Sequence, residues 1–223
     1  MELSYWQSRW KKGNIGFHLD EYYPGLTENW DEIDIKPDAT VLVPLCGKSR
    51  DLLWLSRRAK KVIGVEVSQT AINQFINEHN LKTHNSSFTS FSIVTSGNIE
   101  LWCGDFFKLT EEKFEAIDLI YDKAALTALP PGMRIRYSKK LKNLSSPHTK
   151  ILIQHFKYNQ NEMNGPPFSI PQKEISDLFS DYFVIQELQK MELEIKNFKK
   201  FQNRGLKSHL IEYLSLLSGK EIN

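Results

Sequence analysis

The stretch TVLVPLCGKS, residues 40–49, decides the fold of this chain. Its continuous apolar run is followed by Gly47, which is the pattern of a strand buried on both faces that leads into a tight turn. A second run, KVIGVEV at residues 61–67, follows a segment over residues 51–58 that predicts a helix. Strands buried on both faces are typical of a parallel sheet covered by helices. We therefore expect an α/β fold.

Strands and helices continue to alternate along the rest of the chain. Further strands are predicted over residues 99–103, 114–121 and 149–156, and further helices over residues 69–80, 131–144 and 171–179. Two late strands, over residues 181–191 and 209–217, lack a clear helix between them and predict an antiparallel edge hairpin. The polar residues 81–98 are predicted to form a surface excursion with a small hairpin over residues 91–94. The expected architecture is one Rossmann-like domain over residues 1–223, with a mostly parallel seven-stranded sheet and helices on both faces.

Residues 1–35 precede this alternation and are predicted to form an N-terminal arm, with the core over residues 36–223. Trp6 and Trp10 lie four residues apart in a predicted helix over residues 4–12, so they share one helix face. Two such aromatic residues pack in a core more often than they cover a ligand. Both interpretations of the arm, as packing and as a lid, therefore stay open.

Composition limits the class of function. The 223 residues carry 29 Lys and Arg against 27 Asp and Glu, so the net charge of +2 gives no reason to expect a nucleic-acid partner. The strongly apolar runs fall far short of the roughly 18 residues that a membrane span needs. Cys46 and Cys103 are too few for a disulfide framework or a four-thiolate zinc site, and no metal is expected. We expect a monomeric cytoplasmic protein that binds a small molecule.

The carboxyl ends of the predicted parallel strands carry the candidate binding site, because ligands of open α/β sheets bind there. Gly47 allows close approach of the backbone to a ligand. Glu66 ends the next strand, where a carboxylate accepts hydrogen bonds from the two ribose hydroxyls of an adenosine. Asp105 and Phe106 follow the strand over residues 99–103, and we expect them to hold the adenine, with Asp105 accepting from its amino group and Phe106 covering a ring face.

The loop after the first strand also excludes several cofactors. It has one glycine in place of the G-x-G-x-x-G pattern, which disfavours the close pyrophosphate approach of NAD or FAD. The chain has no G-x-x-x-x-G-K-[ST] motif for a triphosphate either. An adenosine site without a pyrophosphate site points towards S-adenosylmethionine.

Five motifs occur in one order and spacing from about residue 4 to residue 218: WQSRW at 6–10, GFH at 16–18, VPLCGKS at 43–49, GVEVS at 64–68 and GPPF at 165–168. Together they resemble the thiopurine S-methyltransferases of bacteria. The resemblance implies a class I methyltransferase fold, with S-adenosylmethionine as methyl donor and S-adenosylhomocysteine as product. It also implies a small thiol such as a thiopurine as acceptor, allows selenium or tellurium species, and suggests a role in detoxification.

The resemblance also assigns residues to the cofactor site. It matches the family's cofactor contacts to Trp10, Leu45 and Glu66, with Trp6, Phe17 and Gly47 beside them. An arginine usually follows the aspartate at the end of the family's fourth strand, and here that pair is Asp122-Lys123. Lys123 keeps the positive charge near cofactor and substrate, but it lacks the planar fork of a guanidinium. This chain therefore departs from the family's pattern at Lys123, and the departure affects recognition of the thiopurine.

Other residues are candidates for acceptor binding and catalysis. His18 either orients a substrate or is a structural histidine, and Pro167 and Phe168 either wall the acceptor pocket or only stiffen a loop. Asp122 is a candidate base, although a turn-capping role is the commoner one for such a residue, and Lys123 is the other candidate catalytic group. Transfer of a sulfonium methyl to an acidic thiol mainly needs alignment and exclusion of water, so we expect positioning to dominate.

Three alternative functions remain open at this point. A related thiol or halide methyltransferase would share the cofactor residues and differ in the acceptor pocket. A protein that binds S-adenosylmethionine without catalysis would bind the cofactor and make no methylated product. An NAD-dependent dehydrogenase has the least support, because the glycine pattern is missing.

Overall fold

The computed structural model describes residues 3–110 and 116–220 of the chain. They divide into two compact units, one within residues 1–121 and the other within residues 122–223. The expectation of a single domain stays a prediction.

The first unit is built on four parallel strands. These are β5 (Ile99–Cys103), β2 (Lys61–Glu66), β1 (Thr40–Pro44) and β6 (Leu119–Lys123), in that spatial order, and β6 continues two residues into the second unit. Adjacent residues of a strand point to opposite faces of the sheet. Val41 and Leu42 are both fully buried, as are Val62 and Ile63 in β2, so helices or loops cover both faces. The four carboxyl ends, where the sequence places its candidate residues, therefore share one edge.

An antiparallel hairpin extends this sheet beyond β5. It consists of β3 (His84–Phe88) and β4 (Phe91–Ser96), and β4 pairs with β5. Phe91 and Ile93 of β4 are buried while Ser92 between them is exposed, which is the alternation of a half-buried strand.

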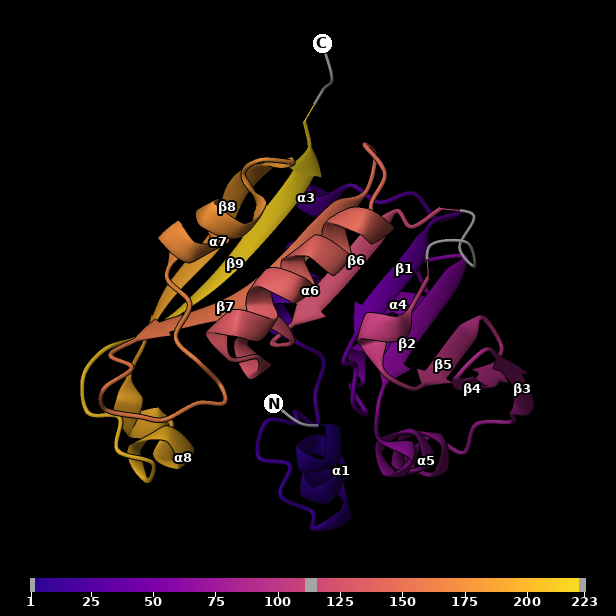
Figure 1. Cartoon of the computed structure of the whole chain (residues 1–223), viewed down its shortest axis with the longest axis horizontal. Coiled ribbons are helices and arrows are strands. Elements are labelled where there is room, and N and C mark those ends of the chain that lie inside the picture. Colours follow the sequence, from indigo (N-terminus) through magenta and orange to yellow (C-terminus); the bar gives the residue numbers. More distant parts are fainter. Residues whose placement is uncertain (1–2, 111–115, 221–223) are drawn as a thin grey trace. The chain divides into compact units, whose positions relative to one another are not determined.

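The helices of the first unit connect the strands and form the arm. They are α1 (Leu3–Lys11), α2 (Pro24–Glu28), α3 (Trp30–Ile33), α4 (Asp51–Ser56), α5 (Gln69–Glu78) and the 3-10 turn η1 (Phe106–Lys108). The Ala71 backbone N–H donates to Ser68 Oγ at 3.4 Å, so Ser68 caps α5 as its sequence position predicts. α1 lies beside α5, which brings the N-terminal arm to this helix (Figure 1).

The second unit consists of a three-stranded antiparallel sheet with helices. β7 (Lys150–Tyr158), β9 (Leu210–Gly219) and β8 (Phe183–Leu193) lie side by side in that order (Figure 1). Its helical segments are α6 (Pro131–Leu144), α7 (Gln172–Phe179), α8 (Lys199–Gln202) and the 3-10 turns η3 (Leu126–Ala128) and η4 (Ile195–Asn197). The predicted late antiparallel strands are thus confirmed as β8 and β9. The absence of a helix between them is not, because η4 and α8 lie in the connection.

The α/β fold class is confirmed, with parallel central strands and antiparallel edge strands. The described residues contain nine strands where seven were expected, because the polar segment after α5 forms β3 and β4. The strand predicted over residues 114–121 begins only at Leu119. Asp118 just before it accepts a hydrogen bond from Thr40 N at 2.7 Å, and Phe114 lies outside the described residues.

Candidate active site

The loop between β1 and α4, residues 45–49, has an unusual backbone. Leu45 has a φ of 49° and Gly47 a φ of 56°, so two of its residues adopt the left-handed conformation. That conformation is costly for leucine and free for glycine. Strained backbone of this kind concentrates at ligand-binding sites. We call residues 45–49 the cofactor loop.

Glu66, the last residue of β2, binds the cofactor loop. Its Oε2 accepts from Gly47 N at 3.0 Å and its Oε1 accepts from Ser68 N at 2.8 Å. Burial raises the pKa of the carboxyl to about 7, an increase that these backbone N–H groups oppose. An ionised carboxylate has about four acceptor positions, so each oxygen can still accept from a ribose hydroxyl.

The aromatic arm, residues 3–35, contacts the same loop. Trp10 is buried, and a Cβ placed on Gly47 would lie 2.8 Å from Trp10 Cζ2, so the indole covers this glycine directly. Phe17 meets Trp6 and Trp10 edge to face, with ring centroids 5.6 Å apart in each pair. The structure therefore brings together the predicted residues Trp6, Trp10, Phe17 and Gly47.

Asp105 and Phe106 lie just after β5, at the edge that also carries Glu66. Glu66 pairs with Cys103 in the sheet register. Asp105 Oδ1 accepts from Phe107 N at 3.0 Å, which starts η1, and Oδ2 forms no hydrogen bond with the residues that the structure describes. Phe106 is buried. Asp105 keeps an oxygen for an adenine amino group, and both residues stay predicted adenine contacts.

His18 in the arm has a carboxylate neighbour. Its Nε2 lies 3.3 Å from Asp20 Oδ1, and the imidazole is mostly buried while Asp20 is exposed. This contact favours the structural interpretation of His18 over a role in substrate binding.

Lys123 and Asp122 stand at the end of β6. Asp122 is buried, and its carboxylate accepts from Ala125 N at 2.8 Å, from Leu126 N at 3.1 Å and from Tyr137 Oη at 2.8 Å. Burial raises the pKa of Asp122 to about 6 against the effect of these donors. The carboxylate thus holds the turn that follows Lys123, where Ala124 has a φ of 63°. This geometry favours turn holding over proton abstraction for Asp122.

The GPPF loop, residues 165–168, is held in place within the second unit. Tyr158 Oη donates to Pro167 O at 2.6 Å, and Phe168 N donates to Thr127 O in η3 at 2.7 Å. The Arg134 guanidinium lies over the Phe168 ring, 5.3 Å from its centroid. Because Thr127 follows Lys123 by four residues, this loop and the Lys123 turn are linked by a hydrogen bond.

The roles of Arg204 and Asp51 were not predicted from the sequence. Arg204 Nη1 donates to Pro166 O at 2.8 Å, and its Nη2 binds Asn164 O, so it holds the GPPF loop from the segment after α8. Asp51 binds several segments of the first unit. A lone arginine near a glycine carries no sequence signal of this role, because its partners are backbone carbonyls 38 and 40 residues away.

His155 in β7 is a buried structural histidine. Its Nδ1 lies 2.9 Å from Ile170 O, so Nδ1 carries the proton, and Nε2 then accepts from Ser215 Oγ at 3.2 Å. The ring also stacks on Tyr213, with centroids 5.1 Å apart. Burial lowers its pKa to about 4.

Acid should therefore destabilise the fold through His155. The folded chain binds fewer protons than the unfolded chain between pH 6.5 and pH 4, so this stability is present at pH 7 and is lost as the pH falls. We expect the difference in unfolding free energy between the wild type and His155→Gln to shrink by about 3 kcal/mol from pH 7 to pH 4. Urea unfolding at both pH values measures it, and an unchanged difference would contradict the buried neutral imidazole.

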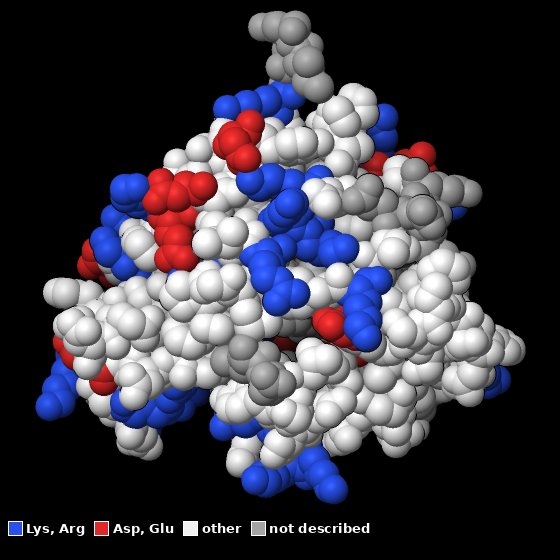
Figure 2. Space-filling view, viewed as in Figure 1, with Lys and Arg blue, Asp and Glu red and all other residues white. Residues whose placement is uncertain are grey.

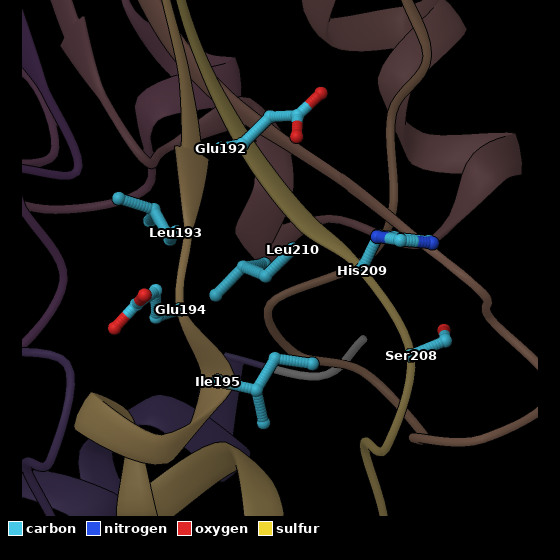
Figure 3. Close-up of a pocket in the computed structure, with 7 residues that line it drawn as sticks. All are labelled: Glu192, Leu193, Glu194, Ile195, Ser208, His209 and Leu210. Carbon is cyan, nitrogen blue, oxygen red and sulfur yellow. The ribbon is translucent and has the colours of Figure 1, made fainter.

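A cavity of about 350 Å³ lies in the second unit. It is lined by Glu192, Leu193, Glu194, Ile195, Ser208, His209 and Leu210, along the end of the β8–β9 hairpin. The carboxylates of Glu192 and Glu194 point in opposite directions in Figure 3, so they do not form a shared cation site. The cavity contains none of the predicted site residues.

Basic side chains gather on one face of the molecule, at the position of α6 (Figures 1 and 2). Two of the helix's cations are paired: Arg134 Nη1 lies 2.6 Å from Glu174 Oε1, and Lys142 Nζ lies 2.7 Å from Asp181 Oδ1. This face gives no separate argument for a polyanionic partner.

Within residues 3–110 and 116–220, no group of three or more His, Cys, Asp or Glu side chains is arranged to hold a metal ion. None of the helices that these residues form has the length and apolar character needed to cross a bilayer.

Comparison with known proteins identifies the family. The family model described as thiopurine S-methyltransferase (TPMT) matches residues 1–217. The chain belongs to the thiopurine S-methyltransferase family. The thiopurine S-methyltransferase of Pseudomonas fluorescens strain SBW25 is 38% identical over 203 residues, which cover 91% of this chain and 93% of the relative. Membership of the thiopurine S-methyltransferase family makes the chain a methyltransferase.

Solved structures agree with this family on the fold. A SAM-dependent methyltransferase from Anabaena variabilis has a TM-score of 0.66 at 13% identity, covering 98% of this chain and 95% of its own. The 1,6-didemethyltoxoflavin N1-methyltransferase of Burkholderia thailandensis, solved with S-adenosylhomocysteine, has a TM-score of 0.63 at 14% identity, covering 97% and 87%. The class I methyltransferase fold expected for a thiopurine S-methyltransferase is thus confirmed.

Proposed function

We propose that this methyltransferase transfers a methyl group to the sulfur of a small aromatic or heterocyclic thiol, and that its first unit holds the methyl donor. S-adenosylmethionine is the cofactor. The observation that carries the proposal is the bond between Glu66 and the cofactor loop, 3.0 Å from Oε2 to Gly47 N. It sets a buried carboxylate with unused acceptor positions beside a loop with left-handed backbone, at the carboxyl edge of the sheet.

The residues present fit an adenosyl sulfonium. Glu66 can accept from the ribose hydroxyls, and the free oxygen of Asp105 can accept from the adenine amino group. Trp6, Trp10 and Phe17 offer aromatic faces and edges next to Gly47. An aromatic face attracts a cation by about 0.5–2 kcal/mol, which suits a sulfonium centre.

The bound cofactor supplies an electrophilic methyl group, and the chain's own residues orient it and exclude water. Glu66 fixes the ribose, and the indole of Trp10 covers Gly47 of the cofactor loop. Alignment of this kind alone can contribute several kcal/mol of barrier reduction in a reaction between two bound groups. A thiol that is ionised at neutral pH needs no general base, which agrees with the role of Asp122 in holding a turn.

The proposed acceptor residues are Lys123, Pro167 and Phe168. Lys123 provides a positive charge for a thiolate, and Pro167 and Phe168 provide an apolar wall held by Tyr158, Arg204 and Arg134. Lysine binds as a compact point charge, so it places fewer geometric demands on the acceptor than the arginine of the family's pattern. We therefore propose an acceptor range that includes thiopurines and extends to other small thiols and to selenium or tellurium species.

We also propose that the chain acts as a monomer in the cytoplasm, in a detoxifying role. Cys46 and Cys103 are both free thiols, which suits a reducing compartment.

A titration followed by a turnover screen tests the proposal on one sample. We expect calorimetry to detect micromolar binding of S-adenosylhomocysteine and none of NAD. With labelled S-adenosylmethionine, thiopurines should be methylated faster than hydrosulfide or iodide. Faster methylation of iodide would favour a halide methyltransferase, and binding without any methylated product would favour a non-catalytic cofactor-binding protein. Absence of S-adenosylhomocysteine binding would overturn the assignment of Glu66 and the cofactor loop.

A further inference from the structure

Asp51 is a buried carboxylate that joins three separate segments of the first unit. It is 1% exposed and opens α4, two residues after the cofactor loop. Its Oδ1 accepts from Tyr23 N at 2.8 Å, and its Oδ2 accepts from Tyr121 Oη at 2.8 Å and from Ser49 Oγ at 3.1 Å. The three donors belong to the aromatic arm, to β6 and to the cofactor loop.

The neighbouring Arg50 holds the same part of the arm. Its Nη1 donates to Asp20 O at 2.7 Å, and its guanidinium carbon lies 5.7 Å from the centroid of the Tyr22 ring. Two successive residues that directly follow the cofactor loop in sequence therefore bind residues 20–23 of the arm. We call Arg50 and Asp51 the arm clasp.

The arm thus contacts two places: the cofactor loop itself and the two residues that follow the loop in sequence. Trp10 covers Gly47 at one point, and the arm clasp binds residues 20–23 at the other. A movement of the cofactor loop would disturb both contacts. The arm and the loop are therefore expected to order together.

The chemistry of Asp51 suits a positioning role. A buried carboxylate is stable only when its oxygens are hydrogen-bonded, and bonds to a charged acceptor are short and directional. Because Asp51 accepts a hydrogen bond from each of three segments, its carboxylate fixes the positions of these segments relative to one another. Tyr121 precedes Lys123 by two residues in β6, so the register extends along the strand that carries this predicted acceptor residue.

We propose that Asp51 is a positioning residue for methyl transfer: through the arm clasp it couples occupation of the cofactor loop to the ordering of the aromatic arm. This inference rests on the proposed cofactor site. It adds that cofactor binding at residues 45–49 also orders residues 20–23, which lie outside that site.

Hydrogen exchange of the full-length chain tests the coupling. We expect S-adenosylhomocysteine to slow exchange of backbone amides in the cofactor loop and also in residues 20–23. In Asp51→Ala the slowing should persist in the loop and be lost in the arm. Asp51→Asn keeps an oxygen that can accept from Tyr23 N, so it should restore the protection of the arm.

Two further variants separate this role from simple stabilisation. Asp118→Ala also removes a carboxylate that binds a backbone N–H of this unit, since Asp118 Oδ2 accepts from Thr40 N at 2.7 Å at the start of β1. It should leave the arm's response to S-adenosylhomocysteine intact. Arg50→Met removes the exposed half of the arm clasp and should weaken the response, which keeps the proposal testable if Asp51→Ala does not fold.

Turnover provides a second readout. For Asp51→Ala we expect kcat to fall about tenfold, because misaligned groups lose much of the benefit of proximity. The KM for S-adenosylmethionine should change little, since Asp51 is not expected to touch it. Arm protection that survives in both Asp51→Ala and Arg50→Met, or that is lost equally in Asp118→Ala, would overturn the inference while leaving the cofactor site standing. Absence of binding to the wild-type chain would overturn the proposed function, and the inference with it.

Discussion

Replacing Glu66 with alanine is expected to raise the dissociation constant of S-adenosylhomocysteine at least tenfold at pH 8. At that pH the carboxyl, whose pKa is about 7, is mostly ionised. A hydrogen bond to a charged acceptor is worth about 1.5–3 kcal/mol, and 1.4 kcal/mol corresponds to a factor of ten in affinity. Calorimetric titration of both proteins at pH 8 measures the change.

The raised pKa of Glu66 also predicts how binding depends on pH. Ribose hydroxyls donate to the ionised carboxylate, so ligand binding favours loss of the proton from Glu66. Above pH 7 this group adds no pH dependence, because it is already ionised in the free protein. Below pH 7 the dissociation constant should rise, by up to about tenfold per pH unit while the free protein is protonated and the complex is not. In Glu66→Gln this dependence should disappear.

Glu100 offers a matched control in the same sheet. It lies on β5 opposite Ile63, three pairs from the Glu66–Cys103 pair, and binds Lys61 and Trp102. Glu100→Ala should leave the affinity for S-adenosylhomocysteine unchanged. An equal loss in both variants would mean that a general change in the unit, rather than the ribose contact, weakens binding.

Replacing Gly47 with alanine is expected to displace Trp10 and weaken S-adenosylhomocysteine binding about tenfold or more. The new Cβ would lie 2.8 Å from Trp10 Cζ2, closer than carbon atoms approach, and the φ of 56° adds backbone strain of about 1–2 kcal/mol. Because Trp10 is buried, its displacement should also shift the tryptophan fluorescence of the free protein to longer wavelength. Titration and emission spectra measure the two effects.

Gly97 is a matched control for the backbone strain. Its φ of 57° equals that of Gly47 to within a degree, and a Cβ there would meet nothing within 4 Å. Gly97→Ala should therefore show the same kind of strain without loss of binding or a fluorescence shift. If the two variants behaved alike, the contact between Trp10 and Gly47 would have no part in the cofactor site.

Most of the fold could be predicted because its strands carry a strong local signal. The buried runs that become β1 and β2 are continuous and apolar, and the Ser68 cap fixes the start of α5 in both sequence and structure. The hairpin of β3 and β4 was only partly predicted, because four of the five residues of β3 are exposed and a run of exposed polar residues lacks the alternation of a half-buried strand. β6 begins only at Leu119, later than predicted. Asp118 just before it binds Thr40 N, a partner 78 residues away that the local sequence pattern does not reveal.

The residues of the candidate site likewise include some that could be predicted from the sequence and others that could not. Gly47 and Glu66 were predicted because each ends a strand, and parallel strands bring their carboxyl ends to one edge. The roles of Asp51, Arg134 and Arg204 could not be predicted, because each binds a partner 28 or more residues away: Tyr23 N for Asp51, Glu174 for Arg134 and Pro166 O for Arg204. Asp122 was a candidate base from its position, whereas the structure surrounds it with turn N–H groups and the hydroxyl of Tyr137.

The sequence by itself determined the class of fold, the family and the place of the cofactor loop, because these depend on local periodicity and on motifs in a fixed order. Only the tertiary structure decided that Trp10 covers Gly47 and that Asp51 binds three segments. It also decided that Glu66 is buried enough to raise its pKa to about 7. Burial and hydrogen bonding depend on which distant residues meet, and this is set by how the strands and helices pack rather than by their local sequence.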